Sequence, residues 1–276
     1  MRGVLDCIPG SMEGLLLKLP LNPSLLEVLP MSSGFALSVR GIVKRFGNVY
    51  AVRGLSFDVY PGEIFCLVGP NGAGKTTTLR ILAGILEPDS GEVLVFGSKV
   101  DRRSVEYRRM IAYLPEDAGV PRTLTGLDYL EFIASIYYED EVEKREAVRR
   151  GVELSGLGDR VRDRAGSYSK GMRRRLLLAG ALMVNPKIAI LDEPTAGLDV
   201  AYAVAVRNTI VDYARRTGAT IVASSHNMLE VEYICDRVAL INQGVIVELG
   251  KPRELIEKHG VGNLEEVFVR VVGERG

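Results

Sequence analysis

Apolar and polar positions along the chain follow two different periods, and segments of the two kinds follow one another. Residues 63–68, 188–191 and 219–224 are short continuous apolar runs, the pattern of strands buried on both faces of a sheet. The segments between them have the 3.6-residue period of helices, and one begins after a capping Asp199 and ends at Gly218. Helices that alternate with buried strands predict an α/β fold with a mostly parallel sheet covered on both faces.

The remaining pattern adds two smaller units to this core. Residues 36–59 alternate apolar and polar side chains between tight turns, which predicts antiparallel strands, and residues 237–250 have the pattern of a closing hairpin. Residues 125–158 form two amphipathic helical segments with no strand between them, which predicts a helical subdomain over about 118–166. We expect residues 1–34 to be a poorly ordered N-terminal extension, 35–250 the main domain and 251–276 a C-terminal tail.

Composition excludes several classes of protein. The 276 residues carry 35 Lys and Arg and 35 Asp and Glu, and a zero net charge argues against a general nucleic-acid binder. Cys7, Cys66 and Cys235 are odd in number and form no CxxC pair, which favours reduced thiols in a cytoplasmic protein over a disulfide framework or a zinc site. No apolar stretch approaches the roughly 20 residues of a membrane span.

"GPNGAGKTT" follows one buried strand and opens a helix, which is the context of a phosphate-binding P-loop. Its glycines let backbone N–H groups surround phosphates, Lys75 reaches the β- and γ-phosphates, and the Thr76 hydroxyl binds Mg²⁺. A glycine-rich turn with an exposed lysine is the alternative, and the coincidence of strand, loop and helix disfavours it. The predicted binding residues are Gly69, Pro70, Asn71, Gly72, Ala73, Gly74, Lys75, Thr76 and Thr77.

"IAILDEP" at residues 188–194 supplies two acidic residues to the predicted site. Asp192 comes at the carboxyl end of a buried strand, where ligands bind in open α/β sheets, and would hold Mg²⁺ through water. Glu193 follows it and is placed to accept a proton from an attacking water. A solvated acidic pair at a strand end is the alternative, which the P-loop makes the weaker one.

From about residue 36 to 250, the chain resembles the ATPase subunits of ABC transporters, because "GPNGAGKTT" and "LDEPTAGLD" both have the form that this family uses. The resemblance implies a P-loop NTPase (RecA-like) core with a parallel sheet, an antiparallel β lobe and an inserted helical subdomain. It also implies that ATP and Mg²⁺ bind between two subunits arranged head to tail, either two copies or one copy and a paralogue, and that hydrolysis drives a permease.

The resemblance assigns three further residues. Asp199 of "AGLD" would meet the partner subunit, and His226 of "ASSH" would contact the γ-phosphate. Phe46 of "KRFG" would stack on adenine, as an aromatic face can. The alternatives are an ordinary histidine at a strand end for His226 and core packing for Phe46.

Two segments depart from the commonest family pattern. Glu116 in "LPED" stands where the family usually has glutamine; a glutamate can still accept a hydrogen bond from water or bind Mg²⁺. "YSKGM" at residues 168–172 replaces the usual L-S-G-G-Q, with Ser169 and Gly171 retained and Lys170 and Met172 different. This variant is similar to that of exporter-type subunits whose permease is a separate chain. Ser169 is expected to cap the helix that follows and to face the γ-phosphate of another subunit's ATP.

The resemblance therefore predicts an integral-membrane permease as partner, a location at the cytoplasmic face of the cell membrane, and no nucleic-acid partner. The permease would dock near Glu116, against aromatic side chains of the helical subdomain that are partly exposed, although helix packing is their alternative role: Tyr129, Phe132, Tyr137 and Tyr138. ABC-type ATPases of DNA repair are disfavoured, because the segment between Thr76 and Ser169 has no room for long coiled coils. Ribosome-binding relatives are disfavoured because the chain has one P-loop.

Overall fold

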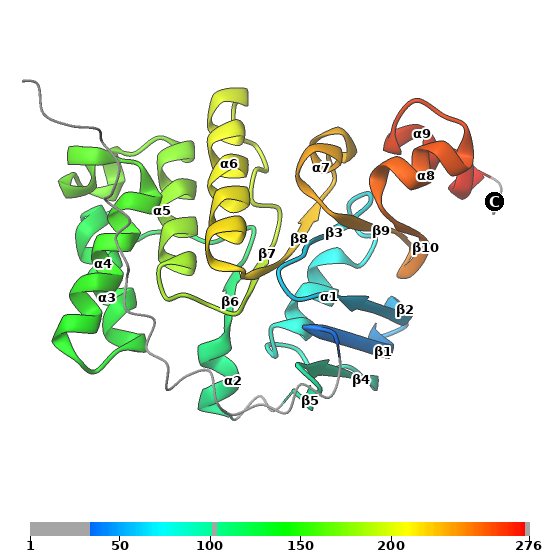
Figure 1. Ribbon diagram of the computed structural model, residues 1–276, viewed down its shortest axis with the longest axis horizontal. Coiled ribbons are helices and arrows are strands. Elements are labelled where there is room, and N and C mark those ends of the chain that lie inside the picture. Colours follow the sequence, from blue (N-terminus) through cyan, green and yellow to red (C-terminus); the bar gives the residue numbers. More distant parts are fainter. Residues whose placement is uncertain (1–33, 101–103, 274–276) are drawn as a thin grey trace, which may run out of the picture. The chain divides into compact units, whose positions relative to one another are not determined.

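A six-stranded sheet forms the centre of the computed structural model, which describes residues 34–100 and 104–273. Its strand order is β10-β9-β3-β8-β7-β6, and every neighbouring pair is parallel except β10 with β9 (Figure 1). The strands are β3 (Ile64–Val68), β6 (Ile111–Leu114), β7 (Ile188–Leu191), β8 (Thr220–Ser225), β9 (Arg237–Asn242) and β10 (Val245–Gly250). The predicted parallel core is confirmed, and the predicted N-terminal extension lies, apart from Gly34, outside the described residues.

A second, antiparallel sheet forms the β lobe and has the order β2-β1-β4-β5. Its strands are β1 (Leu37–Phe46), β2 (Val49–Val59), β4 (Ser90–Val95) and β5 (Ser98–Lys99). Helix α1 (Lys75–Leu82) lies between the two sheets and contacts both of them (Figure 1). The helix that begins directly after the P-loop is therefore held from two sides.

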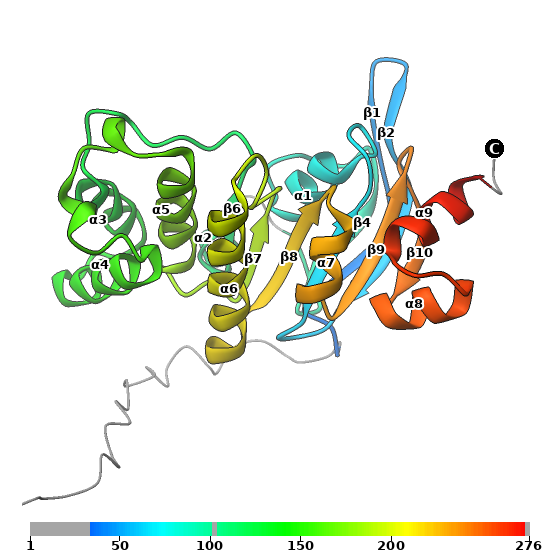
Figure 2. The same ribbon diagram turned by 90° about the horizontal axis from the view of Figure 1, so that it is seen from above.

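Three helices cover the opposite face of the central sheet: α5 (Lys170–Leu182), α6 (Val200–Thr217) and α7 (Met228–Ile234) (Figure 1). At one end, α3 (Gly126–Tyr137) and α4 (Glu141–Ser155) pack with α5 and form the helical subdomain (Figure 2). Thr125 and Asp140 cap these two helices with their side chains. The short helix α2 (Val105–Met110), which precedes β6, is absent from the sequence-based prediction.

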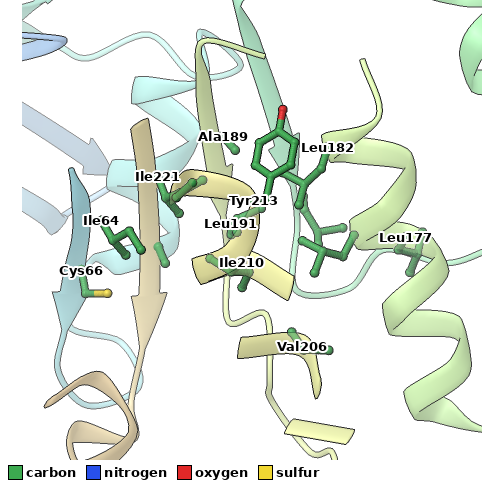
Figure 3. Close-up of a cluster of buried hydrophobic side chains, with 14 of the residues drawn as sticks. Ile64, Cys66, Leu177, Leu182, Ala189, Leu191, Val206, Ile210, Tyr213 and Ile221 are labelled. Carbon is green, nitrogen blue, oxygen red and sulfur yellow. The ribbon is translucent and has the colours of Figure 1, made fainter. Parts of the chain in front are cut away.

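The central strands are apolar throughout because their alternate residues enter two different cores. On β3, Ile64, Cys66 and Val68 pack on the helix-covered face, while Phe65 and Leu67 pack toward α1 and the β lobe. Figure 3 shows the first core, in which side chains of α5 and α6 lie against those of β3, β7 and β8. Burial on both faces is the reason that these strands lack polar alternation.

The C-terminal tail is helical. Helices α8 (Pro252–His259) and α9 (Leu264–Gly273) contact each other, and they also contact β10 and α7. Leu255 of α8 and Val267 of α9 are buried in the same core as the helices that cover the sheet. Across the described ranges, the model has no helix that is both long enough and apolar enough for a membrane crossing.

Cys66 of β3 and Cys235 at the end of α7 form a disulfide, which contradicts the expectation of reduced thiols. The two residues are 169 positions apart in the sequence, and the fold brings their Cα atoms to 6.2 Å. That separation lies within the usual range for a disulfide. The sequence shows no such pairing because the contact arises only when α7 packs onto β3.

The topology brings four loops to one edge of the sheet. Strands β3, β8, β7 and β6 are consecutive neighbours and all run in parallel, so their carboxyl ends lie together. The P-loop follows β3, His226 follows β8, the Asp192–Glu193 pair follows β7, and Pro115 and Glu116 follow β6. A ligand site in an α/β sheet is expected at this edge.

Candidate functional site

The P-loop is closely packed where its glycines require it. A Cβ atom at Gly69 would lie 2.1 Å from the carbonyl oxygen of Ile241, and one at Gly74 would lie 2.4 Å from that of Ala51. Gly74 also has a φ of +105° and begins α1 with no capping side chain. The first amides of α1 are therefore not occupied by a side-chain cap, which suits them to an anion.

Replacing Gly74 by alanine is expected to destabilise the folded chain by about 1–3 kcal/mol from backbone strain alone, and further through the collision with Ala51. Gly72 is the matched control, since its φ is +78° but a Cβ there would meet nothing within 4 Å. Denaturant unfolding and nucleotide titration of G74A and G72A measure both effects. Equal losses in the two variants would contradict the role given to close packing at Gly74.

Lys75 lies inside the loop with 5 % of its side chain exposed. Its Nζ donates to the carbonyl oxygens of Gly69 at 2.7 Å and Pro70 at 3.2 Å, and it lies 3.3 Å from Glu193 Oε1. The lysine thus links the start of the P-loop to the acidic turn after β7. Thr76 and Thr77, which follow it on α1, are half-buried.

The acidic turn after β7 is buried and held by hydrogen bonds. Asp192 Oδ1 accepts from the Ser224 hydroxyl at 2.6 Å, and that hydroxyl accepts from the Glu193 N–H at 2.9 Å. Glu193 has a φ of +46°, in the left-handed region that a residue with a side chain adopts only under constraint. Ser224, on the neighbouring β8, therefore fixes both acidic residues.

His226 completes this cluster. Its Nδ1 lies 2.8 Å from Glu193 Oε2, so a proton on Nδ1 donates to the carboxylate. The histidine side chain is half exposed, at 51 %, while that of Glu193 is 6 % exposed. Lys75, Glu193 and His226 thus form one chain of contacts from the P-loop to the surface.

The arrangement fits a polyphosphate with a divalent cation. Glu193 Oε1 is buried 3.3 Å from the Lys75 ammonium group, so a proton acceptor lies directly beside the cation of the P-loop. Asp192 and Thr76 supply oxygen atoms, which Mg²⁺ prefers. Among the described residues, no three His, Cys, Asp or Glu side chains gather as a metal site. Such a cation would take its remaining ligands from phosphate and water.

The other predicted site residues do not join this cluster. Within the described ranges, no hydrogen bond or ion pair connects Ser169, Gly171 or Asp199 with Lys75 or Glu193. Ser169 caps α5 by accepting from the Met172 N–H at 3.1 Å, and Asp199 Oδ1 caps α6 by accepting from the Tyr202 N–H at 3.1 Å. Both predicted caps are confirmed, and both residues are exposed.

Gly171 and Gly197 are constrained by packing within the chain. A Cβ at Gly171 would lie 2.3 Å from the ring of Tyr202, and one at Gly197 would lie 2.1 Å from Lys170 Nζ. Lys170 and Gly197 line a solvent-open cavity, together with Glu116, Arg173 and His226. The start of α5 and the loop before α6 therefore border the same open space as His226.

Two predicted residues lie on exposed surface. Phe46, at the end of β1, is 53 % exposed, with Lys44 Nζ 5.8 Å from its ring centroid. Tyr50 on β2 is a second exposed aromatic nearby that the sequence analysis leaves out, and the guanidinium carbons of Arg45 and Arg53 each lie 5.8 Å from its ring centroid. Glu116 is also exposed.

Two buried polar residues of the site are absent from the sequence-based prediction. Ser224 precedes the predicted His226 by two positions, on the strand next to β7, and that placement is the signal that points to it. Arg174 belongs to the basic run of α5 and is 7 % exposed, while Arg173 and Arg175 are half-buried.

The family model described as "ABC transporter" matches residues 52–196, which span β2, the P-loop, the helical subdomain and the acidic turn. The chain is 33 % identical over 241 residues to the linearmycin resistance ATP-binding protein LnrL of Bacillus subtilis (strain 168), which covers 86 % of this chain and 76 % of that protein. It is 36 % identical over 239 residues to the Nod factor export ATP-binding protein I of Rhizobium sp. (strain N33), covering 86 % and 77 %.

A solved structure titled "Structure of ATP binding subunit of ABC transporter" has the same fold, with a TM-score of 0.75 and 27 % identity. The alignment covers 86 % of this chain and 99 % of that one. The match therefore includes the helical subdomain and the β lobe as well as the parallel sheet.

Proposed function

This chain belongs to the ABC transporter family, as an ATPase subunit, and we propose that it hydrolyses ATP at the interface of a head-to-tail dimer to drive export through a membrane permease. One observation carries the proposal. The buried Glu193 carboxylate lies between Lys75 of the P-loop, 3.3 Å from Oε1, and His226, 2.8 Å from Oε2. That is the position required of a group that accepts a proton from water beside a bound γ-phosphate.

Each residue of this cluster then has one task. The loop amides and Lys75 bind the β- and γ-phosphates and offset their negative charge. Glu193 orients the attacking water and accepts its proton, and His226 binds the γ-phosphate and holds the Glu193 carboxylate. Thr76 and Asp192 are the residues that would hold Mg²⁺, which on binding neutralises phosphate charge. Glu116, exposed at the end of β6, would reach the same water or the cation from the side.

The second half of the site comes from another subunit. Ser169 and Gly171 stand at the N-terminus of α5, whose helix dipole favours an anion, and no hydrogen bond or ion pair in the described ranges links them to the chain's own Lys75 or Glu193. A head-to-tail pair of subunits brings each α5 terminus, together with the exposed Asp199, to the P-loop of the other. The partner is a second copy or a paralogue. The side chain of Phe46, which is exposed, would stack on the adenine ring of ATP.

The permease would dock on α3 of the helical subdomain. Phe132 and Ile136 are 57 % and 62 % exposed, and their i, i+4 spacing places them together on one face of the helix. Of the four aromatic side chains, some of which are expected to be partly exposed, the other three are half-buried: Tyr129, Tyr137 and Tyr138. Export is supported by the relatives, one of which is a Nod factor export ATP-binding protein. The proposed location is the cytoplasmic face of the cell membrane, where the subunit would be held by its permease.

Purification of the tagged chain from detergent-solubilised membranes is expected to recover an integral-membrane protein together with it. The F132D variant is expected to lose that partner and to keep its ATP hydrolysis, since Phe132 lies away from the P-loop. V269D on α9 is the matched control, because Val269 is also a highly exposed apolar residue, at 69 %. Recovery of ribosomes or DNA in place of a membrane protein would overturn the proposal, and loss of the partner in both variants would overturn the docking face.

A further inference from the structure

Arg174 is a buried cation that makes no hydrogen bond to a carboxylate. It lies on α5, one turn after Ser169, and its residue exposure is 7 %. A guanidinium group has five N–H donors in a rigid plane. All five donate, and every acceptor is a backbone carbonyl oxygen.

The five acceptors belong to two turns at the carboxyl edge of the sheet. Nη1 donates to the first turn, which follows β6, and Nη2 and Nε donate to the second, which follows β7. The acceptor oxygens and distances are Pro115 (2.9 Å), Glu116 (3.2 Å), Asp192 (2.7 Å), Glu193 (2.9 Å) and Pro194 (2.9 Å). One side chain of α5 therefore holds the backbone of both turns.

The second of these turns needs to be held. Glu193 has a φ of +46°, a backbone conformation that costs on the order of 1–3 kcal/mol and persists only where the surroundings enforce it. Arg174 Nη2 donates to the carbonyl oxygens of Asp192 and Glu193, which belong to the peptide groups before and after the Glu193 Cα atom. The Ser224 hydroxyl accepts from the Glu193 N–H. The direction of the Glu193 side chain depends on this backbone.

Burial of the guanidinium is unfavourable in itself. It lowers the pKa of Arg174, while the nearby charges of Asp192, Glu116 and Glu193 act in the opposite direction. An apolar residue of similar size would fill the space without this cost. The arginine therefore contributes a specific geometry rather than simple packing.

We propose that Arg174 is a positioning residue that fixes the turns of Glu193 and Glu116 to helix α5, so that the Glu193 carboxylate is aligned for hydrolysis only while α5 is in place. This inference rests on the proposed role of Glu193. Because α5 carries Ser169 at its start and packs on α3 and α4, the arginine connects the helical subdomain to the group that accepts the proton.

Steady-state hydrolysis by R174M and R174K, with ATP binding measured separately, tests the proposal. We expect kcat to fall on the order of 10²-fold in R174M, since misplacement by about 1 Å has that effect, while ATP affinity changes little. R174K is expected not to restore kcat, because an ammonium group offers three donors from one point and cannot bridge two turns. R174K retains the charge, so it keeps the test open if R174M fails to fold.

R150M is the matched structural control. Arg150 of α4 also donates to a backbone carbonyl of another element, through Nε and Nη2 to Met183 O, but it reaches neither turn. It is expected to lower the melting temperature with kcat unchanged. A merely structural role for Arg174 would give R174M the pattern of R150M, and that result overturns the proposal.

The double variant R174M/E193Q separates this inference from the proposed function. If Arg174 acts through Glu193, adding R174M to E193Q is expected to lower the residual rate little further. A full additional 10²-fold loss overturns the inference. Wild-type rates in R174M and R174K, with E193Q inactive, also overturn it and leave the proposed function intact. A wild-type protein that does not hydrolyse ATP overturns both.

Discussion

The E193Q variant is expected to hydrolyse ATP about 10²–10⁴-fold more slowly than the wild type and to bind ATP with the same affinity. Glutamine is nearly isosteric with glutamate, so the contacts with Lys75 and His226 can be retained in part. It cannot accept a proton from water, which is the task proposed for the carboxylate. Phosphate release and equilibrium binding of ATP measure the two quantities on one preparation.

The same variant is expected to accumulate as an ATP-bound dimer, because the step that opens the composite site is blocked. Size-exclusion chromatography with and without ATP detects this change. E193Q/S169A is the matched control: Ser169 lies outside the P-loop cluster, so the double variant should bind ATP through the P-loop and fail to dimerise. Wild-type hydrolysis by E193Q would show that Glu193 is not the base, and an equal dimer in E193Q/S169A would contradict the role of the α5 terminus.

If E193Q forms a dimer and E193Q/S169A does not, the exposure of Ser169 and Asp199 is also explained, because both side chains would face the partner subunit. Both side chains cap helices in the single chain, through the Met172 and Tyr202 amides. Each cap leaves an oxygen-bearing side chain on the exposed surface, one position away in the sequence from Lys170 or Leu198, which line the cavity beside His226. In the proposed dimer, the partner subunit would meet helix ends that are already formed, which lowers the entropic cost of association.

The sequence predicts those parts of the molecule that are set by local chemistry. The P-loop, the caps at Ser169 and Asp199 and the helix end at Gly218 depend on residues within a few positions of one another, and all are confirmed. The buried strands are predicted because a continuous apolar run has few other uses in an α/β chain. The shared edge of the sheet follows from the parallel order of these strands.

The contacts that set the geometry of the site are non-local, and the sequence does not show them. Ser224 reaches Asp192 only because β8 lies beside β7, and Arg174 reaches the turns only because the first turns of α5 lie beside the carboxyl edge. Each residue type has a common alternative use: serine at a strand end is ordinary, and arginines at a helix start are usually solvated. Their spacing carries no signal, since the arginine binds backbone oxygens that every residue has, and the serine binds an aspartate that belongs to another strand.

The disulfide between Cys66 and Cys235 is expected to contribute about 2–5 kcal/mol to the free energy of unfolding, because it closes a loop of 169 positions in the unfolded chain. It joins β3, which leads into the P-loop, to the end of α7, which follows His226. The C66A/C235A variant is expected to melt roughly 5–20 °C below wild type, at the 2–4 °C per kcal/mol typical of chains of this size. Calorimetry without reductant measures the shift.

Treatment with a reductant distinguishes the stability that comes from the disulfide bond from the stability that comes from packing of the two side chains. Replacing the two buried cysteines by alanine also removes side-chain volume next to Ile210 and Ala223, which is destabilising by itself. Reductant is expected to lower the melting temperature of the wild type and to leave that of C66A/C235A unchanged, so the wild-type shift isolates the bond. Thiol titration of the denatured wild type should find two fewer free thiols before reduction than after. If reductant leaves the melting temperature of the wild type unchanged and all its thiols are free before reduction, the two cysteines only pack against each other.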